Sequence, residues 1–320
     1  MSVAVLGAGA FGTALAVALA REGQAVTLWA RDAAQAGALD RTRENAARLP
    51  GVVLPKGIAV TADLPRAAAA ETLLLAVPMQ SLSGLLAAHD LWRGRHLVAC
   101  CKGVDLATGR LPSAVIAGAA PGAVPALLSG PSFAVDIAAG LPTALTLAAG
   151  AEDTARALQQ RLSTPVLRLY RTTDLAGVEL GGALKNVVAI ACGMAIGAGL
   201  GESARAAVMT RGYAEIMRLA LARGARPETL AGLSGFGDLV LTGTSEKSRN
   251  YAFGLRLGRA GRAETTATTE GIATARAVAA LAARDGLDMP ITTAIAAVLD
   301  GKWTVKQAAE ALLARPLRSE

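Results

Sequence analysis

The stretch Gly7-Ala8-Gly9-Ala10-Phe11-Gly12 decides the fold, because it joins a short apolar run at 3–6 to a helical pattern at 12–22. Three glycines at this spacing are the fingerprint of a dinucleotide-binding βαβ unit. The first permits a tight turn, the second lets the backbone approach a pyrophosphate, and the third lets the helix pack on the strand. A glycine-rich turn without a ligand is the alternative. The strand–turn–helix context, with a second strand predicted at 25–29, favours a dinucleotide whose negative charge faces the helix N-terminus.

The end of the second predicted strand bears on which dinucleotide is bound. NAD-binding proteins place an acidic residue there, about 20 residues beyond the glycine fingerprint. In this chain Ala30 and Arg31 come before Asp32. Because a cation at this point suits the 2′-phosphate of NADP, we expect NADP as the cofactor. NAD is the alternative, in which Arg31 is solvated and Asp32 contacts the ribose.

The hydrophobic pattern divides the chain into two parts. In the first part, short apolar runs alternate with helical patterns, which indicates a mainly parallel sheet covered on both faces. These predicted strands lie at 3–6, 25–29, 73–77, 97–100, 126–128, 144–147 and 166–169. In the second part, the patterns are helical and lie at 175–197, 203–223, 227–232, 248–258, 269–285, 291–299 and 304–314. The fold class expected is therefore α/β: an N-terminal Rossmann-type, doubly wound domain over 1–173, followed by an all-helical substrate domain over 174–320. The active site of such a pair is expected in the cleft between the domains.

Composition limits the classes of partner. The 320 residues include 32 Lys and Arg against 25 Asp and Glu, so the net charge is +7, which favours anionic ligands. The basic residues are dispersed and only 3% of residues are aromatic, so nucleic-acid binding is not expected. Three cysteines and two histidines show no metal-binding spacing, and a reducing, cytoplasmic setting fits them best. The apolar residues 2–20 lack the basic start of a signal peptide, and the run 187–200 is too short and too glycine-rich to span a membrane.

Two loops follow predicted strands of the first part. Lys102, in Cys101-Lys102-Gly103, comes directly after the strand at 97–100 and is expected to bind an anion at the carboxyl edge of the sheet. The loop Ser129-Gly130-Pro131-Ser132-Phe133-Ala134 could offer N–H groups and a hydroxyl to a substrate. The alternatives are a surface lysine and a plain Gly-Pro turn.

Lys185 is the most unusual residue of the helical part. It stands beside Asn186 in a run that, Glu179 apart, is apolar or small from residue 175 to 196. Lysine is rarely buried, and burial lowers its pKa, which makes it a competent general acid or base. Gly181 and Gly182 leave room for something to approach closely. The alternative is a lysine that reaches solvent at a domain or subunit boundary.

Three further segments carry polar residues. Asp238 is predicted in a glycine-rich loop, where its carboxylate could orient an ammonium or a hydroxyl, although it could equally be a helix cap. Ser248-Arg249-Asn250 opens a predicted helix and could bind a phosphate, with Ser248 as an ordinary N-cap the alternative. Glu270 is most simply an acidic residue of a first helical turn.

Taken together, these segments resemble the bacterial-type NAD(P)-dependent sn-glycerol-3-phosphate dehydrogenases over essentially the whole chain. SGPSFA at 129–134, LGGALKN at 180–186, and GFGDLVLT at 235–242 followed by SRN at 248–250 are the specific segments. The chain departs from the family pattern at Cys101, Gly243 and Thr268. A 6-phosphogluconate or β-hydroxyacid dehydrogenase shares the two-domain plan and the Lys-Asn pair, but should lack SRN after GDL. A non-enzymatic dinucleotide sensor would have no use for Lys185.

The resemblance implies reduction of dihydroxyacetone phosphate to sn-glycerol 3-phosphate for glycerophospholipid synthesis, with Lys185 as the catalytic proton carrier and no metal. It implies that the substrate contacts Lys102, Gly130, Ser132, Lys185, Asp238, Ser248, Arg249 and Asn250. Contacts with the cofactor, NADP or NAD, are implied for Ala10, Phe11, Arg31, Lys102, Ala134, Arg249, Thr268 and Glu270, beside the fingerprint residues Gly7, Gly9 and Gly12. The partner expected is a phosphorylated triose, with no nucleic acid and no membrane; a homodimer is left open.

Overall fold

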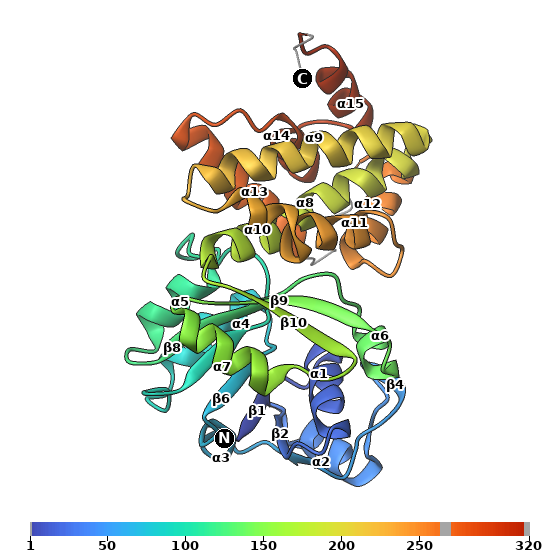
Figure 1. Cartoon of the computed structure of the whole chain (residues 1–320). Helices are drawn as coiled ribbons and strands as arrows, with labels where there is room; N and C mark the ends of the chain where they lie inside the picture. Colours follow the sequence, from blue (N-terminus) through green and yellow to red (C-terminus); the bar gives the residue numbers. More distant parts are fainter. Residues whose placement is uncertain (1, 263–269, 317–320) are drawn as a thin grey trace. The chain divides into compact units, whose positions relative to one another are not determined.

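The computed structural model describes residues 2–262 and 270–316. The chain divides into two compact units, Met1–Glu179 and Leu180–Glu320, each described by itself below. Figure 1 shows a sheet with helices in the N-terminal part of the chain and helices alone in the C-terminal part, which confirms the predicted fold class. The predicted domain boundary at 173/174 lies just before α8 (Leu175–Gly197), a helix whose first residues belong to the first unit.

The first unit is built on one eight-stranded sheet with the strand order β10-β9-β8-β7-β6-β1-β2-β5. Neighbouring strands are parallel except β8 and β9, which are antiparallel. The strands are β1 (Val3–Leu6), β2 (Val26–Trp29), β5 (Ile58–Thr61), β6 (Thr72–Leu75), β7 (His96–Ala99), β8 (Val124–Ser129), β9 (Thr143–Ala149) and β10 (Leu167–Thr172). The chain order reverses between β1 and β6. In open α/β sheets, ligands bind beyond the carboxyl ends of the strands at such a reversal.

Helices cover both faces of this sheet, as Figure 1 shows. They are α1 (Ala10–Arg21), α2 (Ala33–Thr42), α3 (Leu64–Ala68), α4 (Met79–Ala87), α5 (Pro112–Ala119), α6 (Ala134–Ala139) and α7 (Glu152–Leu162). The central strands are buried on both sides, as in β1 and β6, each buried at all four positions, whereas the edge strands β5 and β10 have exposed residues. Two clusters of mostly Ala, Leu and Val side chains form, one on each face. The apolar, aromatic-poor composition is therefore used for a covered, mainly parallel sheet.

The sequence pattern does not predict three short strands that the structure contains. β3 (Glu44–Asn45) and β4 (Leu49–Val53) form a separate antiparallel hairpin, and β5 is the edge strand of the main sheet. β4 contains a proline and a glycine, and most of its residues are exposed, so it lacks an apolar pattern. β5 has only four residues and is buried only at its two ends, Ile58 and Thr61.

The second unit contains helices only, among the residues that the structure describes. They are the remainder of α8, α9 (Gly201–Leu221), α10 (Pro227–Ala231), the π-helix η1 (Leu233–Gly237), α11 (Asp238–Gly243), α12 (Arg249–Ala260), α13 (Glu270–Asp285), α14 (Pro290–Leu299) and α15 (Val305–Leu313). Pro227 and Pro290 lie in the first turns of their helices, and Thr304 caps α15 in a capping box with Gln307.

Glycines let α8 and α12 touch through their backbones. A Cβ on Gly193 would lie 2.1 Å from the Tyr251 carbonyl oxygen, and one on Gly254 would lie 2.1 Å from the Ile190 carbonyl oxygen. Any side chain at either position would force the two helices apart. The glycine-rich character of this part of the chain is thus a packing requirement of the helical unit.

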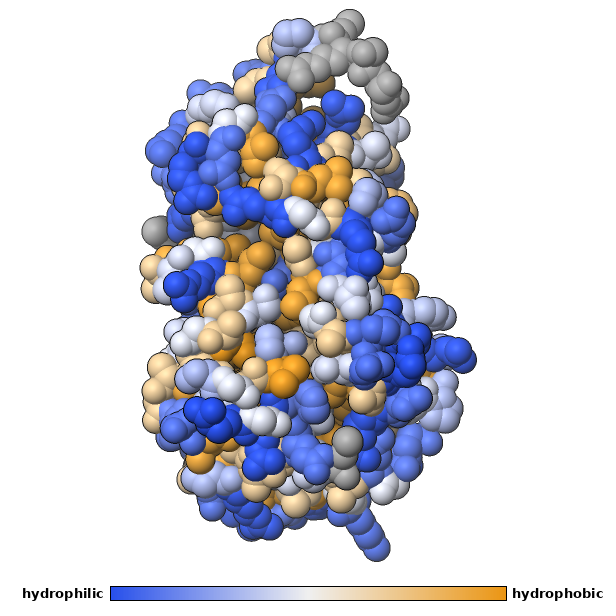
Figure 2. Space-filling view, turned by 60° about the vertical axis from the view of Figure 1, so that its left-hand side comes forward, coloured by the Kyte–Doolittle hydropathy of each residue, from blue (hydrophilic) through white to orange (hydrophobic). Residues whose placement is uncertain are grey.

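Helix α8 is long and apolar enough to cross a membrane, and it is the only such helix among the described residues. At 23 residues it is longer than the run 187–200 that was judged too short. However, 89% of its most apolar window is buried within the protein, which is the pattern of a core helix. On the face of the molecule that Figure 2 shows, hydrophobic residues are interspersed with hydrophilic ones. Burial, and not length, therefore argues against a membrane span.

Glu179, near the start of α8, is a buried carboxyl group in this core. Its Oε1 accepts a hydrogen bond from the Ser113 backbone N–H at 2.5 Å, and its Oε2 accepts one from the Ser113 hydroxyl at 2.8 Å. Burial raises the pKa of Glu179 from 4.5 to about 7, and the two hydrogen bonds oppose the shift. The carboxyl group therefore binds its proton more tightly in the folded than in the unfolded state.

We expect Glu179→Gln to flatten the pH dependence of stability. Between about pH 4.5 and 7 the folded state holds a proton that the unfolded state has lost, so this group makes stability fall as the pH rises. Glutamine keeps a carbonyl acceptor for Ser113 without titrating. Across that window the free energy of unfolding of the variant, relative to that of the native protein, should rise by up to about 1.4 kcal/mol per pH unit. Thermal unfolding at pH 5, 6, 7 and 8 measures this difference.

The matched control is Glu152→Gln. Glu152 is exposed, and hydrogen bonding to Arg171 lowers the pKa of its carboxyl group. Its contribution has the opposite sign and is lost only as the pH falls below about 4.5. From pH 5 to 8 the difference between Glu152→Gln and the native protein should therefore stay nearly constant. A constant difference between Glu179→Gln and the native protein at all four pH values would contradict the assignment.

Candidate functional site

The glycine fingerprint lies at the reversal of the sheet. Gly7 has φ +119°, and a Cβ there would lie 2.6 Å from the Ala76 carbonyl oxygen, just beyond β6. A Cβ on Gly12 would lie 2.1 Å from the Gly7 carbonyl oxygen and 2.9 Å from the Ala76 Cβ. The protein's own packing thus requires the first and third glycines.

The second glycine, Gly9, is different. A Cβ there would meet nothing within 4 Å, and the φ of Gly9 is an ordinary −79°. The N-cap of α1 is Gly9, which has no side chain to bind the first N–H groups, and these lack intrahelical partners. Ala10 and Phe11 are partly exposed. An open space beside an uncapped helix N-terminus fits a phosphate group. These residues therefore suit the pyrophosphate of a dinucleotide.

Arg31 and Asp32, the two candidates for contact with the ribose or its 2′-phosphate, differ in their surroundings. Asp32 is the N-cap of α2, and its Oδ1 accepts a hydrogen bond from the Ala34 N–H at 2.8 Å. Arg31 is exposed directly after β2. The carboxylate at this strand end therefore has a structural task, whereas the guanidinium faces solvent.

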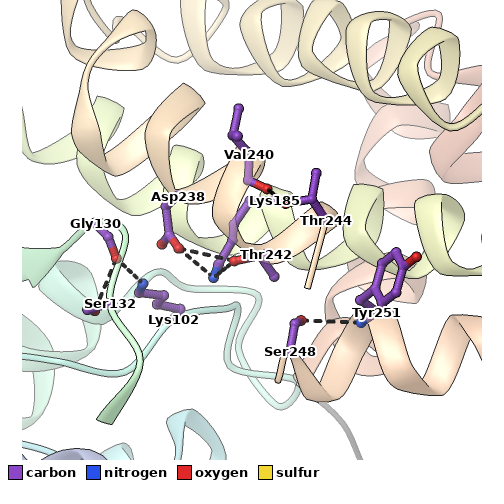
Figure 3. Close-up of polar contacts among 10 residues, drawn as sticks. All are labelled: Lys102, Gly130, Ser132, Lys185, Asp238, Val240, Thr242, Thr244, Ser248 and Tyr251. Atoms are coloured by element: carbon purple, nitrogen blue, oxygen red, sulfur yellow. Dashed lines mark hydrogen bonds and ion pairs between the residues drawn. The ribbon is translucent and has the colours of Figure 1, made fainter. Parts of the chain in front are cut away.

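The loops after β7 and β8 converge on one carbonyl oxygen (Figure 3). Lys102 Nζ donates a hydrogen bond to the Gly130 carbonyl at 3.3 Å, and Ser132 Oγ donates to the same oxygen at 3.2 Å. Because β7 and β8 are parallel to β1 and β6, both loops lie at the carboxyl edge that holds the glycine fingerprint. Ala134 follows as the first residue of α6. The structure thus brings together Lys102, Gly130 and Ser132.

Within the helical unit, Lys185 is buried, with 8% of its surface exposed, and its ammonium group has two close partners (Figure 3). Nζ lies 2.8 Å from Asp238 Oδ1 and 2.6 Å from Thr242 Oγ1. The Thr242 hydroxyl also lies 3.1 Å from Asp238 Oδ1, so the three polar atoms form a closed triangle. Asp238 and Thr242 are themselves 2% and 4% exposed.

Two expectations about this cluster need correction. Asp238 does not lie in a loop: it is the first residue of α11, directly after the π-helix η1. The group that approaches Gly181 is protein backbone, since a Cβ there would lie 3.0 Å from Gly235 Cα and 3.0 Å from the Ser234 carbonyl oxygen. Gly235 looks like a loop residue in sequence, yet a Cβ there would lie 2.0 Å from the Leu230 carbonyl oxygen. It therefore allows a tightly packed π-helix, a feature frequent at functional sites.

Thr242 was missed as a site residue. The available signal was its spacing of four from Asp238, which places both side chains on one face once the segment is helical. The loop prediction for Asp238 concealed this relation.

The cluster can hold and move a proton at Lys185 Nζ. Burial alone favours the neutral amine, but a carboxylate at 2.8 Å favours the ammonium. The sequence alone does not place this carboxylate beside Lys185. An ammonium in a buried site is both a proton donor and a fixed positive charge for an oxygen that gains negative charge.

The segment 248–250 opens α12 as predicted, and two of its residues have structural partners. Ser248 is the N-cap, and its Oγ accepts a hydrogen bond from the Tyr251 N–H at 3.3 Å (Figure 3). Asn250 Oδ1 accepts one from the Gly271 N–H at 3.2 Å. Arg249 is exposed at the first helical position. Glu270 begins α13, and Thr268 lies outside the described residues.

Comparisons with known proteins agree over both units. The family model for the N-terminal part of NAD-dependent glycerol-3-phosphate dehydrogenase matches residues 2–155, and the model for its C-terminal part matches residues 174–310. Glycerol-3-phosphate dehydrogenase (NAD(P)+) of Ruegeria sp. (strain TM1040) is 60% identical over 321 residues, covering 100% of both chains. The protein of that name from Cereibacter sphaeroides is 60% identical over 319 residues, covering 99% of this chain and 100% of the other.

Comparison with solved structures shows that the fold is also similar to that of a known enzyme. The crystal structure of glycerol-3-phosphate dehydrogenase from Coxiella burnetii has a TM-score of 0.92 at 35% identity, covering 98% of this chain and 99% of the other. The model for the C-terminal part matches the segment that carries Lys185, Asp238 and Arg249. With family models matching most of its length and full-length relatives at 60% identity, this chain belongs to the NAD-dependent glycerol-3-phosphate dehydrogenase family.

Proposed function

We propose that this chain carries out the reaction of its family, the interconversion of dihydroxyacetone phosphate and sn-glycerol 3-phosphate with NADP or NAD, with Lys185 as the proton carrier. The observation that carries the proposal is the buried cluster of Lys185, Asp238 and Thr242, with Nζ 2.8 Å from Asp238 Oδ1 and 2.6 Å from Thr242 Oγ1. Such a cluster has no use in a dinucleotide sensor. We assign its product to glycerophospholipid synthesis, as the resemblance implies.

In this proposal the residues of the first unit hold the cofactor. Gly7, Gly9 and Gly12, with Ala10 and Phe11, accommodate its pyrophosphate at the uncapped N-terminus of α1. When bound, the nicotinamide supplies the hydride for the ketone carbon. Lys102, Ala134 and Arg249 are assigned further contacts with the cofactor, and so are Thr268 and Glu270.

The remaining residues bind and protonate the substrate. Lys185 Nζ gives a proton to the oxygen that gains charge as the ketone is reduced, and Asp238 and Thr242 hold the ammonium in place. Arg249, with Ser248 and Asn250 at the start of α12, anchors the phosphate group, which does not react. Lys102, Gly130 and Ser132 complete the set of substrate contacts.

A spectrophotometric assay of NADPH oxidation tests the proposed reaction. Oxidation is expected with dihydroxyacetone phosphate and sn-glycerol 3-phosphate is expected as the product. Oxidation with a β-keto acid instead would point to a β-hydroxyacid dehydrogenase. Turnover of 6-phosphogluconate with NADP+ would point to that class of enzyme. Cofactor binding with no turnover of any of these substrates would leave only a sensor.

Arg31→Asp is expected to lower kcat/KM for NADPH far more than kcat/KM for NADH. Arg31 is exposed after β2 while Asp32 is engaged as the cap of α2, so Arg31 is the better candidate for the 2′-phosphate. In the variant this phosphate would meet a carboxylate. The measurement is kcat/KM for NADPH and NADH in the native protein and the variant, with Arg41→Asp, an exposed arginine near the end of α2, as a charge-matched control. Equal losses for both cofactors would show that Arg31 does not contact the 2′-phosphate.

Three further assignments belong to the proposal. The cytoplasm is its proposed location, since a reducing compartment fits three cysteines that form no disulfide. Its partner is a small phosphorylated molecule, and neither nucleic acid nor membrane is needed for the reaction. Homodimer formation is left open, and sedimentation of the purified protein measures it.

A further inference from the structure

The hairpin formed by β3 and β4 carries a buried polar residue that the reaction does not explain. Asn45 is 4% exposed, and its Nδ2 donates one hydrogen bond to the Ala8 carbonyl at 3.0 Å and another to Thr13 Oγ1 at 2.8 Å. Both amide hydrogens are therefore used. Ala8 stands between the first two glycines of the fingerprint, 37 residues away in the chain.

A second amide binds the same carbonyl. Gln35 Nε2, from α2, donates to the Ala8 oxygen at 3.0 Å. A carbonyl oxygen has two lone pairs, and here each has its own donor. Two side chains from separate elements thus fix the direction of one peptide group in the middle of the glycine-rich loop.

Fixing the carbonyl also fixes the neighbouring N–H. The peptide group between Ala8 and Gly9 is planar, and in the trans form its C=O and N–H point in opposite directions. With the Ala8 oxygen held by Asn45 and Gln35, the Gly9 N–H is turned to the opposite side of the peptide. Gly9 is also the glycine whose missing Cβ faces open space.

The hairpin that carries Asn45 is itself held firmly. Arg43 Nη2 donates to the Pro55 carbonyl at 2.8 Å and to the Ile58 carbonyl at 2.9 Å, and Glu44 Oε1 accepts from the Gly51 N–H at 2.8 Å. The amide of Asn45 is therefore presented from a rigid element, as a positioning group requires.

We infer that Asn45, assisted by Gln35, is a positioning residue that orients the Gly9 N–H toward the pyrophosphate of the dinucleotide. This inference rests on the proposed role of the glycine fingerprint as the pyrophosphate site. The short hairpin then has a function: through Asn45 it orients the glycine-rich loop 7–12 without contacting the cofactor itself.

The test is the affinity for ADP-ribose, which contains the pyrophosphate but no nicotinamide, measured by titration calorimetry. Asn45→Ala is expected to raise the Kd by about 5- to 10-fold, the effect of losing one oriented hydrogen bond. Asn45→Asp should raise it further, because a carboxylate then faces the Ala8 carbonyl. Gln35→Ala, at a partly exposed position that does not endanger folding, should raise it by about 2- to 3-fold.

Thr13→Val is the matched control for a purely structural role. It removes the other partner of Asn45 at the same buried site but leaves the bond to Ala8, so the Kd should change less than 2-fold. The KM for dihydroxyacetone phosphate at saturating NADPH should stay unchanged in Asn45→Ala. The inference is overturned if Asn45→Ala and Thr13→Val weaken the binding of ADP-ribose equally. It is also overturned if Asn45→Ala raises the KM for dihydroxyacetone phosphate together with the KM for NADPH.

A further variant separates this inference from the proposal beneath it. Gly9→Val fills the open space at the glycine fingerprint itself and should strongly weaken the binding of ADP-ribose. If Gly9→Val weakens binding and neither Asn45→Ala nor Gln35→Ala does, the loop binds the cofactor but Asn45 does not position it. If Gly9→Val has no effect either, the assignment of the loop as the pyrophosphate site fails.

Discussion

Lys185→Met is expected to lower kcat by at least about 10²-fold while NADPH binding stays intact, since proton transfer and charge stabilisation are each worth that much. Methionine keeps the length of the side chain and its apolar body but has neither the proton nor the charge. The cofactor contacts assigned to the first unit are unaffected. Single-turnover and steady-state measurements of NADPH oxidation, with calorimetry for cofactor affinity, give the two quantities.

The partner of Lys185 complicates this substitution and also supplies its control. In Lys185→Met the Asp238 carboxylate, 2% exposed, loses its cation, and breaking a buried pair in this way costs about 3–5 kcal/mol. The double variant Lys185→Met/Asp238→Asn removes the stranded charge and should recover much of the lost stability without recovering kcat. A double variant with near-normal kcat would show that the lysine serves stability and carries no proton.

Arg249→Ala is expected to raise the KM for dihydroxyacetone phosphate by about 10- to 100-fold. A charge-assisted hydrogen bond is worth roughly 1.5–3 kcal/mol, and about 1.4 kcal/mol corresponds to a factor of ten. Arg249 is exposed at the first position of α12, where the helix N-terminus adds to the attraction for a dianion. Part of the loss should appear in kcat, because remote binding energy also helps to orient the reacting carbon.

Unphosphorylated dihydroxyacetone is the informative comparison for Arg249. It offers the guanidinium nothing to hold, so its slow turnover should change little in the variant, apart from any contact of Arg249 with the cofactor. If both substrates lose activity by the same factor at unchanged NADPH affinity, Arg249 is not the phosphate anchor. Lys102 is then the next residue to replace.

Much of the fold could be predicted because its elements have strong periodic signals. Covered strands such as β1 are apolar over their whole length, and the 23-residue α8 is apolar or small except at Glu179, Lys185 and Asn186. Prolines and caps mark the starts of α10, α14 and α15. The elements that escaped prediction draw their stability from contacts distant in sequence. The β3–β4 hairpin depends on Arg43, whose guanidinium binds carbonyls 12 and 15 residues away.

The candidate site shows the same division. Lys185 could be singled out because a lysine in an apolar helix is unusual, but its pairing with Asp238 spans 53 residues and has no local signature. Thr242 and Asn45 were not predicted for a similar reason: each acts through a hydrogen bond to a residue distant in sequence, Lys185 and Ala8 respectively. Their residue types, threonine and asparagine, are ordinary in surface turns.

The backbone contact between α8 and α12 limits how this protein can be engineered for heat resistance. Replacing helical glycines with alanine is a common route to a more stable variant, since alanine narrows the unfolded ensemble and favours the helix. At Gly193 and Gly254 the added methyl group would lie 2.1 Å from a carbonyl oxygen of the facing helix. A redesign guided by helix propensity alone would select these positions, and it would separate the helix that carries Lys185 from the helix that begins with Arg249.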